Sequence, residues 1–273
     1  KTGLLVPRLG ESDKGGTELV VPWYWNIAPH RDATITPHVM SRRGVMLGSE
    51  FRYLNQKSYG EIDFDYLPDD DLRGGDRHLL RFRRYDAFSP DLDLEIDINT
   101  ASDDDYFRDF SDSLSISTIT HLERRADLRY RSDDWNLLAR VQNFQTLYGG
   151  VEPYRRLPQI LFTGRWPQSG VGMPLELGLD AEFVSFERDD SITGRRIDLA
   201  PSISLPYRGP GWHLTPQVKY RQTSYRLRHT GPGVERSPSR GLPIFSIDGG
   251  LEFERPLDGG RFLHRRPSVS HAG

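Results

Sequence analysis

Hydrophobic and polar residues alternate with a period of two along most of this chain. The run 91–99 (DLDLEIDIN) alternates without an error, with leucine and isoleucine at one set of positions and acidic residues or asparagine at the other. A period of two puts successive side chains on opposite faces of a β-strand. The pattern recurs at 61–66, 175–183, 197–205 and 214–221. No helical period persists, so the sequence predicts an all-β, antiparallel fold.

Further strands are predicted at 45–56, 77–86, 113–130, 135–147 and 157–165. Two more runs within 21–40 and one at 247–253 bring the total to about thirteen. Residues 1–15 are expected only to lead into the first strand. Strands of about 8–13 residues are long for a soluble sandwich. They match the length that a tilted strand needs to cross a bilayer. Charged residues fill one face and aromatic residues gather near strand ends, which is typical of a membrane barrel. The sequence therefore predicts part of a transmembrane β-barrel wall, with a soluble β-sandwich or propeller as the alternative.

Composition narrows the class of protein. The 273 residues are 36% hydrophobic, mean hydropathy is −0.61, and no apolar run is long enough for a membrane helix. A net charge of −3 excludes a strongly basic nucleic-acid surface. There is no cysteine, so these residues form no disulfide and carry no thiolate chemistry. The chain begins at Lys1 without an initiator methionine or signal peptide, and it is expected to be a processed product or a fragment.

The segment 21–40 has the most unusual composition. Its two strand-like runs carry Pro22 and Pro37 at positions where a ladder N–H is expected. Proline cannot donate that hydrogen bond, so it belongs on an edge or weakly paired strand. We therefore expect a weakened seam at this segment. The aromatic residues expected to lie along it are Trp23, Tyr24 and Trp25.

No catalytic or metal-binding motif stands out. The eight histidines lack metal-ligand spacing, and the acidic clusters 69–71 and 103–105 lack the glycine and distal glutamate of a calcium loop. No nucleophile elbow or phosphate-binding loop is present. We expect no enzyme activity, no metal and no cofactor. Charges on the polar strand face are expected to line a lumen: Arg81, Arg83, Asp93, Glu95, Arg129 and Arg221.

Several motifs resemble one family. Residues 22–38 read PWYWNIAPHRDATITPH, and residues 41–54 follow with SRRGVMLGSEFRYL. Shorter matches are DYLPDD at 65–70, SDDDYFRDF at 102–110 and PYRRLPQ at 153–159. Together they closely resemble LptD (also called OstA or Imp), the lipopolysaccharide-assembly proteins of the Gram-negative outer membrane.

The resemblance implies a barrel of about 26 strands that crosses the outer membrane. It also implies the lipoprotein LptE as a plug, and periplasmic bridge proteins that deliver lipopolysaccharide to a preceding domain. Lipopolysaccharide would leave for the outer-membrane lipids through a lateral gate between the first and last strands. Prolines in the first two strands weaken that closure, and Pro22 and Pro37 match those motif positions. No nucleic acid is expected as a partner.

The chain departs from the family in two ways. It holds about half the strands of such a barrel, and the tail 265–273 does not resemble the family. Residues 1–264 are thus expected to be the N-terminal half of the barrel domain, followed by a divergent tail. The function implied is lipopolysaccharide transport and assembly at the cell outer membrane. A diffusion porin, an outer-membrane esterase and a soluble β-sandwich binding module remain as alternatives.

Overall fold

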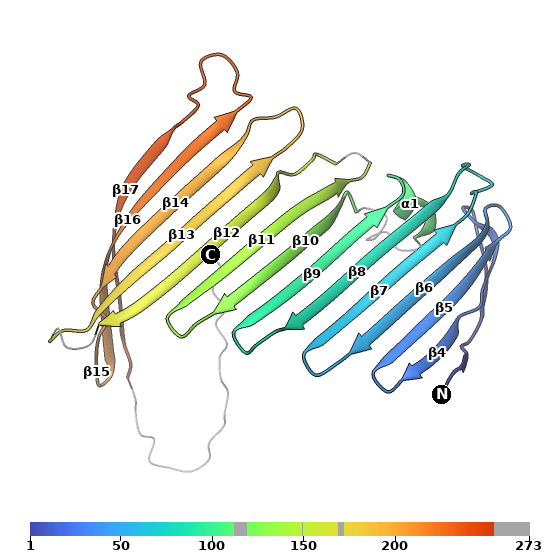
Figure 1. The fold of residues 1–273 in the computed structure, drawn as a ribbon, viewed down its shortest axis with the longest axis horizontal. Helices are drawn as coiled ribbons and strands as arrows, with labels where there is room; N and C mark the ends of the chain where they lie inside the picture. Colours follow the sequence, from blue (N-terminus) through green and yellow to red (C-terminus); the bar gives the residue numbers. More distant parts are fainter. Residues whose placement is uncertain (112–118, 149, 169–171, 254–273) are drawn as a thin grey trace, which may run out of the picture.

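The computed structural model describes residues 1–111, 119–148, 150–168 and 172–253. These residues form one antiparallel sheet of 17 strands (Figure 1). The strands are β1 (Gly3–Leu4), β2 (Arg8–Ser12), β3 (Gly16–Val20), β4 (Trp23–Ala28), β5 (Arg31–Met40), β6 (Gly44–Leu54), β7 (Ser58–Leu67), β8 (Arg77–Ala87), β9 (Leu92–Ala101), β10 (His121–Arg131), β11 (Trp135–Thr146), β12 (Arg155–Gln168), β13 (Leu175–Glu187), β14 (Thr193–Ser204), β15 (Tyr207–Gly209), β16 (Trp212–Arg228) and β17 (Ser239–Leu251). One short helix, α1 (Tyr106–Phe110), lies in the connection between β9 and β10.

The sheet is an open, curved wall whose strands pair in chain order. From β5 to β14 each strand is hydrogen-bonded to the next, β14 pairs with β16, and β16 pairs with β17. The N-terminal edge and β17 lie at opposite sides of the wall (Figure 1). No helix within the described ranges is long and apolar enough to cross a membrane.

Three strands of the wall are each divided by a proline. Pro7 separates β1 from β2, Pro22 separates β3 from β4, and Pro206 separates β14 from β15. Each divided strand keeps its partner on both sides of the break. The 17 segments therefore make 14 continuous strands, because three strands are each counted twice. Proline causes the breaks because it lacks the N–H that a ladder position requires.

The all-β, antiparallel prediction is confirmed, with one error at the N-terminus. Residues 1–15 do not merely lead into the sheet, because β1 and β2 form its outermost strand. The sequence contains a signal for this strand, namely the turn DKGG at 13–16, which joins β2 to β3 as a hairpin. The start of the predicted strand 113–130, up to residue 118, lies outside the described residues, and β10 begins at His121. The tail 265–273 also lies outside them.

The two faces of the sheet differ in chemistry. Register partners on neighbouring strands point to the same face, so the pairing assigns every strand residue to a face. The face that carries Asp63, Arg81, Asp97 and Arg125 is here called the polar face. The opposite, apolar face exposes large hydrophobic side chains, among them Val45, Leu47, Leu128, Val141, Ile160, Ile197, Leu199, Ile203, Val218, Phe245 and Ile247. No second layer covers this face in the described part of the chain.

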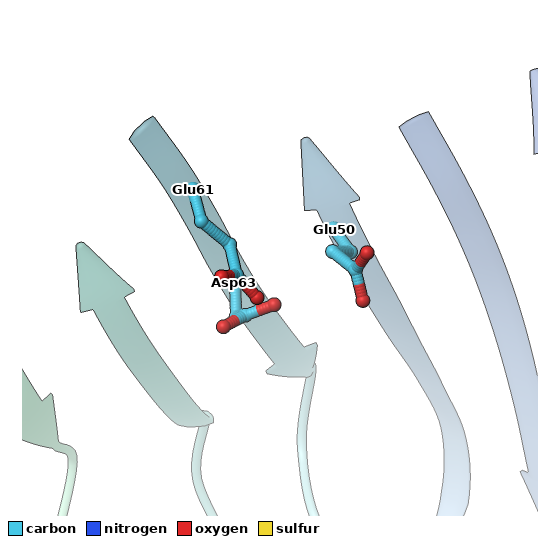
Figure 2. Close-up of side chains that lie close together, drawn as sticks. All are labelled: Glu50, Glu61 and Asp63. Atoms are coloured by element: carbon cyan, nitrogen blue, oxygen red, sulfur yellow. The ribbon is translucent and has the colours of Figure 1, made fainter. Parts of the chain in front are cut away.

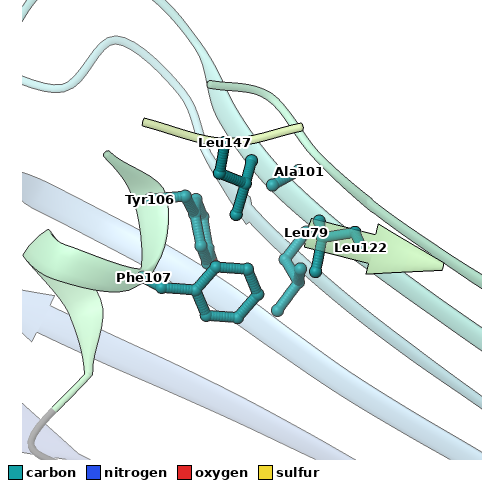
Figure 3. Close-up of a cluster of buried hydrophobic side chains, with 6 residues drawn as sticks. All are labelled: Leu79, Ala101, Tyr106, Phe107, Leu122 and Leu147. Atoms are coloured by element: carbon teal, nitrogen blue, oxygen red, sulfur yellow. The ribbon is translucent and has the colours of Figure 1, made fainter. Parts of the chain in front are cut away.

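The two ends of the wall also differ. At one end the turns are short, as at 29–30, 55–57 and 132–134. At the other, the long-loop end, the connections include 68–76, 102–120 and 229–238. Helix α1 packs against the polar face at the long-loop end. Figure 3 shows the two aromatic rings of the helix against aliphatic side chains from the strands, in a cluster of Leu79, Ala101, Tyr106, Phe107, Leu122 and Leu147.

A buried cluster of charges ties three loops together beneath α1. Arg43 donates to Asp70 at 2.5 Å, and Arg77 donates to Asp70 at 3.1 Å and to Asp109 at 2.5 Å. Arg77 also binds Asp103 through two hydrogen bonds of 2.8 and 2.9 Å. The two arginine side chains and Asp70 are almost fully buried. Arg73 lies 3.6 Å from Asp103 and 3.5 Å from Asp109. Three arginines thus balance three aspartates where the loops meet.

Aromatic contact and hydrogen bonding hold this cluster in its charged form. The Phe110 ring lies 5.1 Å from the Arg43 guanidinium carbon and 4.6 Å from that of Arg77. Burial alone would raise the pKa of the Asp70 carboxyl. Hydrogen bonds from the Leu72 amide and from the two arginines instead hold that pKa below its usual value.

We expect Asp70→Asn to lower the free energy of unfolding by about 3 kcal/mol, because it leaves two buried arginines undercompensated. Urea unfolding of the full-length barrel in detergent measures the loss. Asp71→Asn is the matched control, since Asp71 is exposed and its side chain accepts no hydrogen bond from the described part of the chain. Because the pKa of Asp70 is depressed in the folded state, its stabilisation is present above pH 4 or so and is lost as the pH falls further. Equal stability of the two variants at pH 7 would contradict this account.

Candidate functional site

The N-terminal edge of the wall is poorly hydrogen-bonded at Pro22. The Leu5 amide donates to the Pro22 carbonyl at 2.9 Å. In an antiparallel pair the N–H and C=O of one residue point to the same neighbour. The Pro22 nitrogen therefore also faces the edge strand, where it has no hydrogen to return to Leu5. One bond of this pair is missing between the first strand and the second.

Pro37 removes a bond from the next ladder. The Val21 amide donates to the Pro37 carbonyl at 3.0 Å, but Pro37 cannot donate in return. Its nitrogen therefore faces β3 and β4, not β6. The two prolines thus weaken successive ladders at the same level of the wall, because Val21 and Pro22 are adjacent in the chain.

A third proline, Pro7, lies beside these two and was missed by the reasoning from sequence. Leu5 is bonded to Pro22, whereas Arg8 is in register with Val20. Two residues of the edge strand, Val6 and Pro7, thus face one residue of its partner, which is a β-bulge. The three prolines lie side by side on the first three strands. Pro22 and Pro37 accordingly lie on the second and third strands, not on the first two.

The predicted seam aromatics divide between the two faces. Trp23 and Trp25 lie on the apolar face, and their ring centroids are 5.9 Å apart. Tyr24 points to the polar face, where its hydroxyl lies 3.3 Å from an Asp32 carboxylate oxygen. Beyond them the edge strand exposes apolar side chains, with Val6 88% exposed. The N-terminal edge is thus apolar, aromatic and short of hydrogen bonds. We name this region, formed by β1 to β5, the seam.

The six predicted luminal charges all lie on the polar face, but they do not form one site. Arg129 binds Glu95 at 2.6 Å, Asp127 at 3.1 Å and Asp93 at 3.4 Å. Arg83 binds Glu61 at 3.0 Å, and Arg221 binds Asp198 at 2.9 Å. Most of these arginines therefore neutralise carboxylates on neighbouring strands. Arg81 differs, because it forms no ion pair within the described residues and lies over the Phe107 ring at 5.9 Å.

Three carboxylates on β6 and β7 lie close enough to share a cation. Figure 2 shows Glu61 and Asp63 on one strand and Glu50 on its neighbour. Arg52 binds Glu50 at 3.1 Å, and Arg83 binds Glu61. Acidic groups gathered on an exposed polar surface do not by themselves indicate a metal, and the arginines already supply the compensating charge.

Aromatic side chains form a belt on the apolar face near the short turns. Four rings from β10, β11 and β12 stack in series, with centroid distances of 4.9, 5.7 and 6.1 Å, and they belong to Tyr130, Trp135, Phe162 and Trp166. Phe51 and Tyr53 make a similar contact on β6 at 6.4 Å. Aromatic residues at such a level, beside an exposed apolar band, are typical of the interfacial region of membrane barrels.

Comparison with known proteins identifies one family. The family described as "LptD: LPS transport system D" matches residues 75–265. The LPS-assembly protein LptD of Nitrosococcus oceani is 42% identical over 263 residues, which cover 94% of this chain and 35% of that protein. The protein of the same name from Aromatoleum aromaticum is 42% identical over 258 residues, covering 93% of this chain and 32% of that protein.

The chain thus spans about a third of the length of the curated relatives that it matches. Among solved structures, Pseudomonas aeruginosa OccK5 (OpdH) aligns over 92% of this chain and 77% of its own, at 12% identity and a TM-score of 0.36, too low to equate the two folds. The family match covers more than half of the chain, and the relatives are well above 30% identical over nearly all of it. This chain belongs to the LptD family.

Proposed function

We propose that this chain is the N-terminal half of an outer-membrane barrel wall that carries lipopolysaccharide to the outer leaflet. One observation supports this most strongly. This chain, a member of the LptD family, forms a single sheet with one charged face and one apolar face that no other described element covers. Such a sheet is stable where lipid contacts one side and water the other. The barrel acts in transport, without covalent chemistry and without a cofactor.

The seam is the proposed lateral gate. Two ladder bonds are missing at Pro22 and Pro37, and each is worth about 1 kcal/mol net. Pro7 adds a bulge to the strand that would face the closing strand of the barrel. A ladder weakened in this way opens more readily for a large amphiphile than a fully bonded one.

The polar face is the proposed lumen wall. Its dense charges fit a water-filled interior that holds the lipoprotein LptE as a plug, and bridge proteins would deliver lipopolysaccharide from the periplasmic side. The long-loop end faces the cell exterior, since membrane barrels have short periplasmic turns and longer outer loops.

Two adjacent residues of β16 can test which face of the wall contacts lipid. Val218 lies on the apolar face and is 51% exposed, whereas Gln217 lies on the polar face. We expect Val218→Arg to destabilise the full-length barrel in lipid by about 2–4 kcal/mol, because the charge enters hydrocarbon. Gln217→Arg should change stability little. Equal effects of the two substitutions would contradict a lipid-facing apolar face.

Restoring the missing donors should close the gate. We expect Pro22→Ala with Pro37→Ala to stabilise the seam by about 2 kcal/mol and to slow lipopolysaccharide export up to about thirtyfold. Export is measured with full-length protein in vesicles supplied from the periplasmic side. Pro216→Ala is the control, because Pro216 also accepts a strand hydrogen bond, from Leu205, far from the seam. Export unchanged in the double variant would remove the gate mechanism.

Among the predicted lumen residues, Arg81 is the best candidate to bind the phosphates of lipopolysaccharide. It forms no ion pair with a carboxylate within the described residues. We expect Arg81→Ala to reduce crosslinking between the lumen and lipopolysaccharide about fivefold. Arg221→Ala is the comparison. Because Arg221 already donates a hydrogen bond to Asp198, its loss should reduce crosslinking to lipopolysaccharide less. A larger loss with Arg221→Ala than with Arg81→Ala would reverse the assignment.

A further inference from the structure

The apolar face carries an arginine pair at the long-loop end of β14 and β16. Arg195 and Arg226 are direct register partners on these strands, and both side chains are exposed. Like charges placed opposite each other on one face destabilise a sheet. Neither arginine side chain forms a hydrogen bond or ion pair with any residue that the structure describes. Arg228, two residues further along β16, is also exposed and lacks an anionic partner among them.

The pair lies at the level where lipid headgroups are expected. Trp212 begins β16 on the same face near the short turns, and Arg226 is 14 residues further along the strand. At about 3.3 Å per residue and a tilt of about 45°, the two positions are about 33 Å apart across the membrane. The hydrocarbon core is about 30 Å thick. Trp212 and Arg226 are thus separated by about the thickness of the hydrocarbon core.

Below the pair the wall is hydrophobic on β14, whereas on β16 Ser224 and Gln222 come before the apolar positions. On β14 the apolar face continues from Arg195 to Ile197 and Leu199, which are 47% and 43% exposed. On the neighbouring strand Tyr220 and Val218 are also about half exposed. A molecule with an anionic head at the arginines therefore meets an apolar surface for its tails.

A groove above the pair has room for a headgroup. It has a volume of about 1010 Å³, and its basic lining residues are Arg155, Arg188, Arg228 and His229. Arg155 is engaged by Asp189, and Arg188 lies over the Tyr154 ring at 4.5 Å. Arg228 remains without an anionic partner in the described part of the chain. Glu187, Asp189 and Asp190 also line the groove and balance its three arginines, so Arg228 alone continues the unpaired charge of the pair toward the loops.

We propose that Arg195, Arg226 and Arg228 bind the phosphate of an outer-leaflet lipid headgroup, with the acyl chains of that lipid along β14 and β16. This inference rests on the proposed membrane function, because it needs the apolar face to contact lipid. Arginine suits the ligand, since its guanidinium binds phosphate through two parallel hydrogen bonds. The site lies on the outside of the wall and several strands away from the seam, so it holds a lipid beside the barrel and not one in transit through the lumen.

The test uses the full-length barrel in phosphatidylcholine nanodiscs that contain a trace of lipid A, either diphosphorylated or dephosphorylated. Native mass spectrometry measures the retained lipid A. We expect Arg195→Gln with Arg226→Gln to weaken retention of the diphosphorylated form about thirtyfold, at about fivefold per arginine. The matched control is Arg31→Gln with Arg208→Gln, which removes two exposed arginines at the short-turn end and should leave retention unchanged.

Equal retention by the paired-arginine variant and the wild type would overturn the proposal, as would equal retention of dephosphorylated lipid. Displacement of lipid A by inorganic phosphate at the same concentration would show a site for free phosphate and would also overturn it. Lipopolysaccharide delivery is measured on the same samples. A wild type that retains lipid A but delivers no lipopolysaccharide would count against the proposed transport function and leave the lipid site standing.

Discussion

The structure depends on the interstrand hydrogen-bond ladder of a single sheet. A wall with no second layer cannot rely on a buried core, and its small clusters of buried apolar residues lie mainly where α1 and the loops touch the polar face. Backbone N–H and C=O groups inside a membrane must be paired within the protein. In the membrane setting proposed for this wall, a missing donor therefore has more consequence than in a two-layer fold, and a proline that removes one weakens the wall there.

The prolines of the seam illustrate this constraint. Pro22 and Pro37 each accept a hydrogen bond that they cannot return. Pro206 separates β14 from β15, two strands away from the β17 edge of the wall, and the divided strand keeps its register on both sides of the break. Near Pro7 the register shifts by one residue instead. The same residue type therefore leaves the strand of β14 and β15 regular and loosens the N-terminal edge of the wall.

The polar face is stabilised in a different way. Asp127 is fully buried among the side chains of the sheet and is bound by Arg129 and Arg140. Paired charges on neighbouring strands let a strongly charged surface remain close to neutral. Beneath α1 the same chemistry closes the long-loop end, where Arg77 holds carboxylates from two loops. Arg195 and Arg226, on the outer side of β14 and β16, have no such partner among the described residues and face each other in register, which is the basis for the proposed external ligand.

The sequence by itself determined the all-β class, the alternation of faces and most strand positions, because a period of two is a local property of each strand. It also determined the family, since motifs such as PWYWNIAP are contiguous. The tertiary structure decided what depends on pairing between distant segments. Register made residues 3–12 the edge strand and placed Pro7 beside Pro22, joined Arg43 and Arg77 through Asp70, and set Arg195 opposite Arg226. Local alternation gives the face of a residue but not its neighbour on the next strand, and these sites are made of such neighbours.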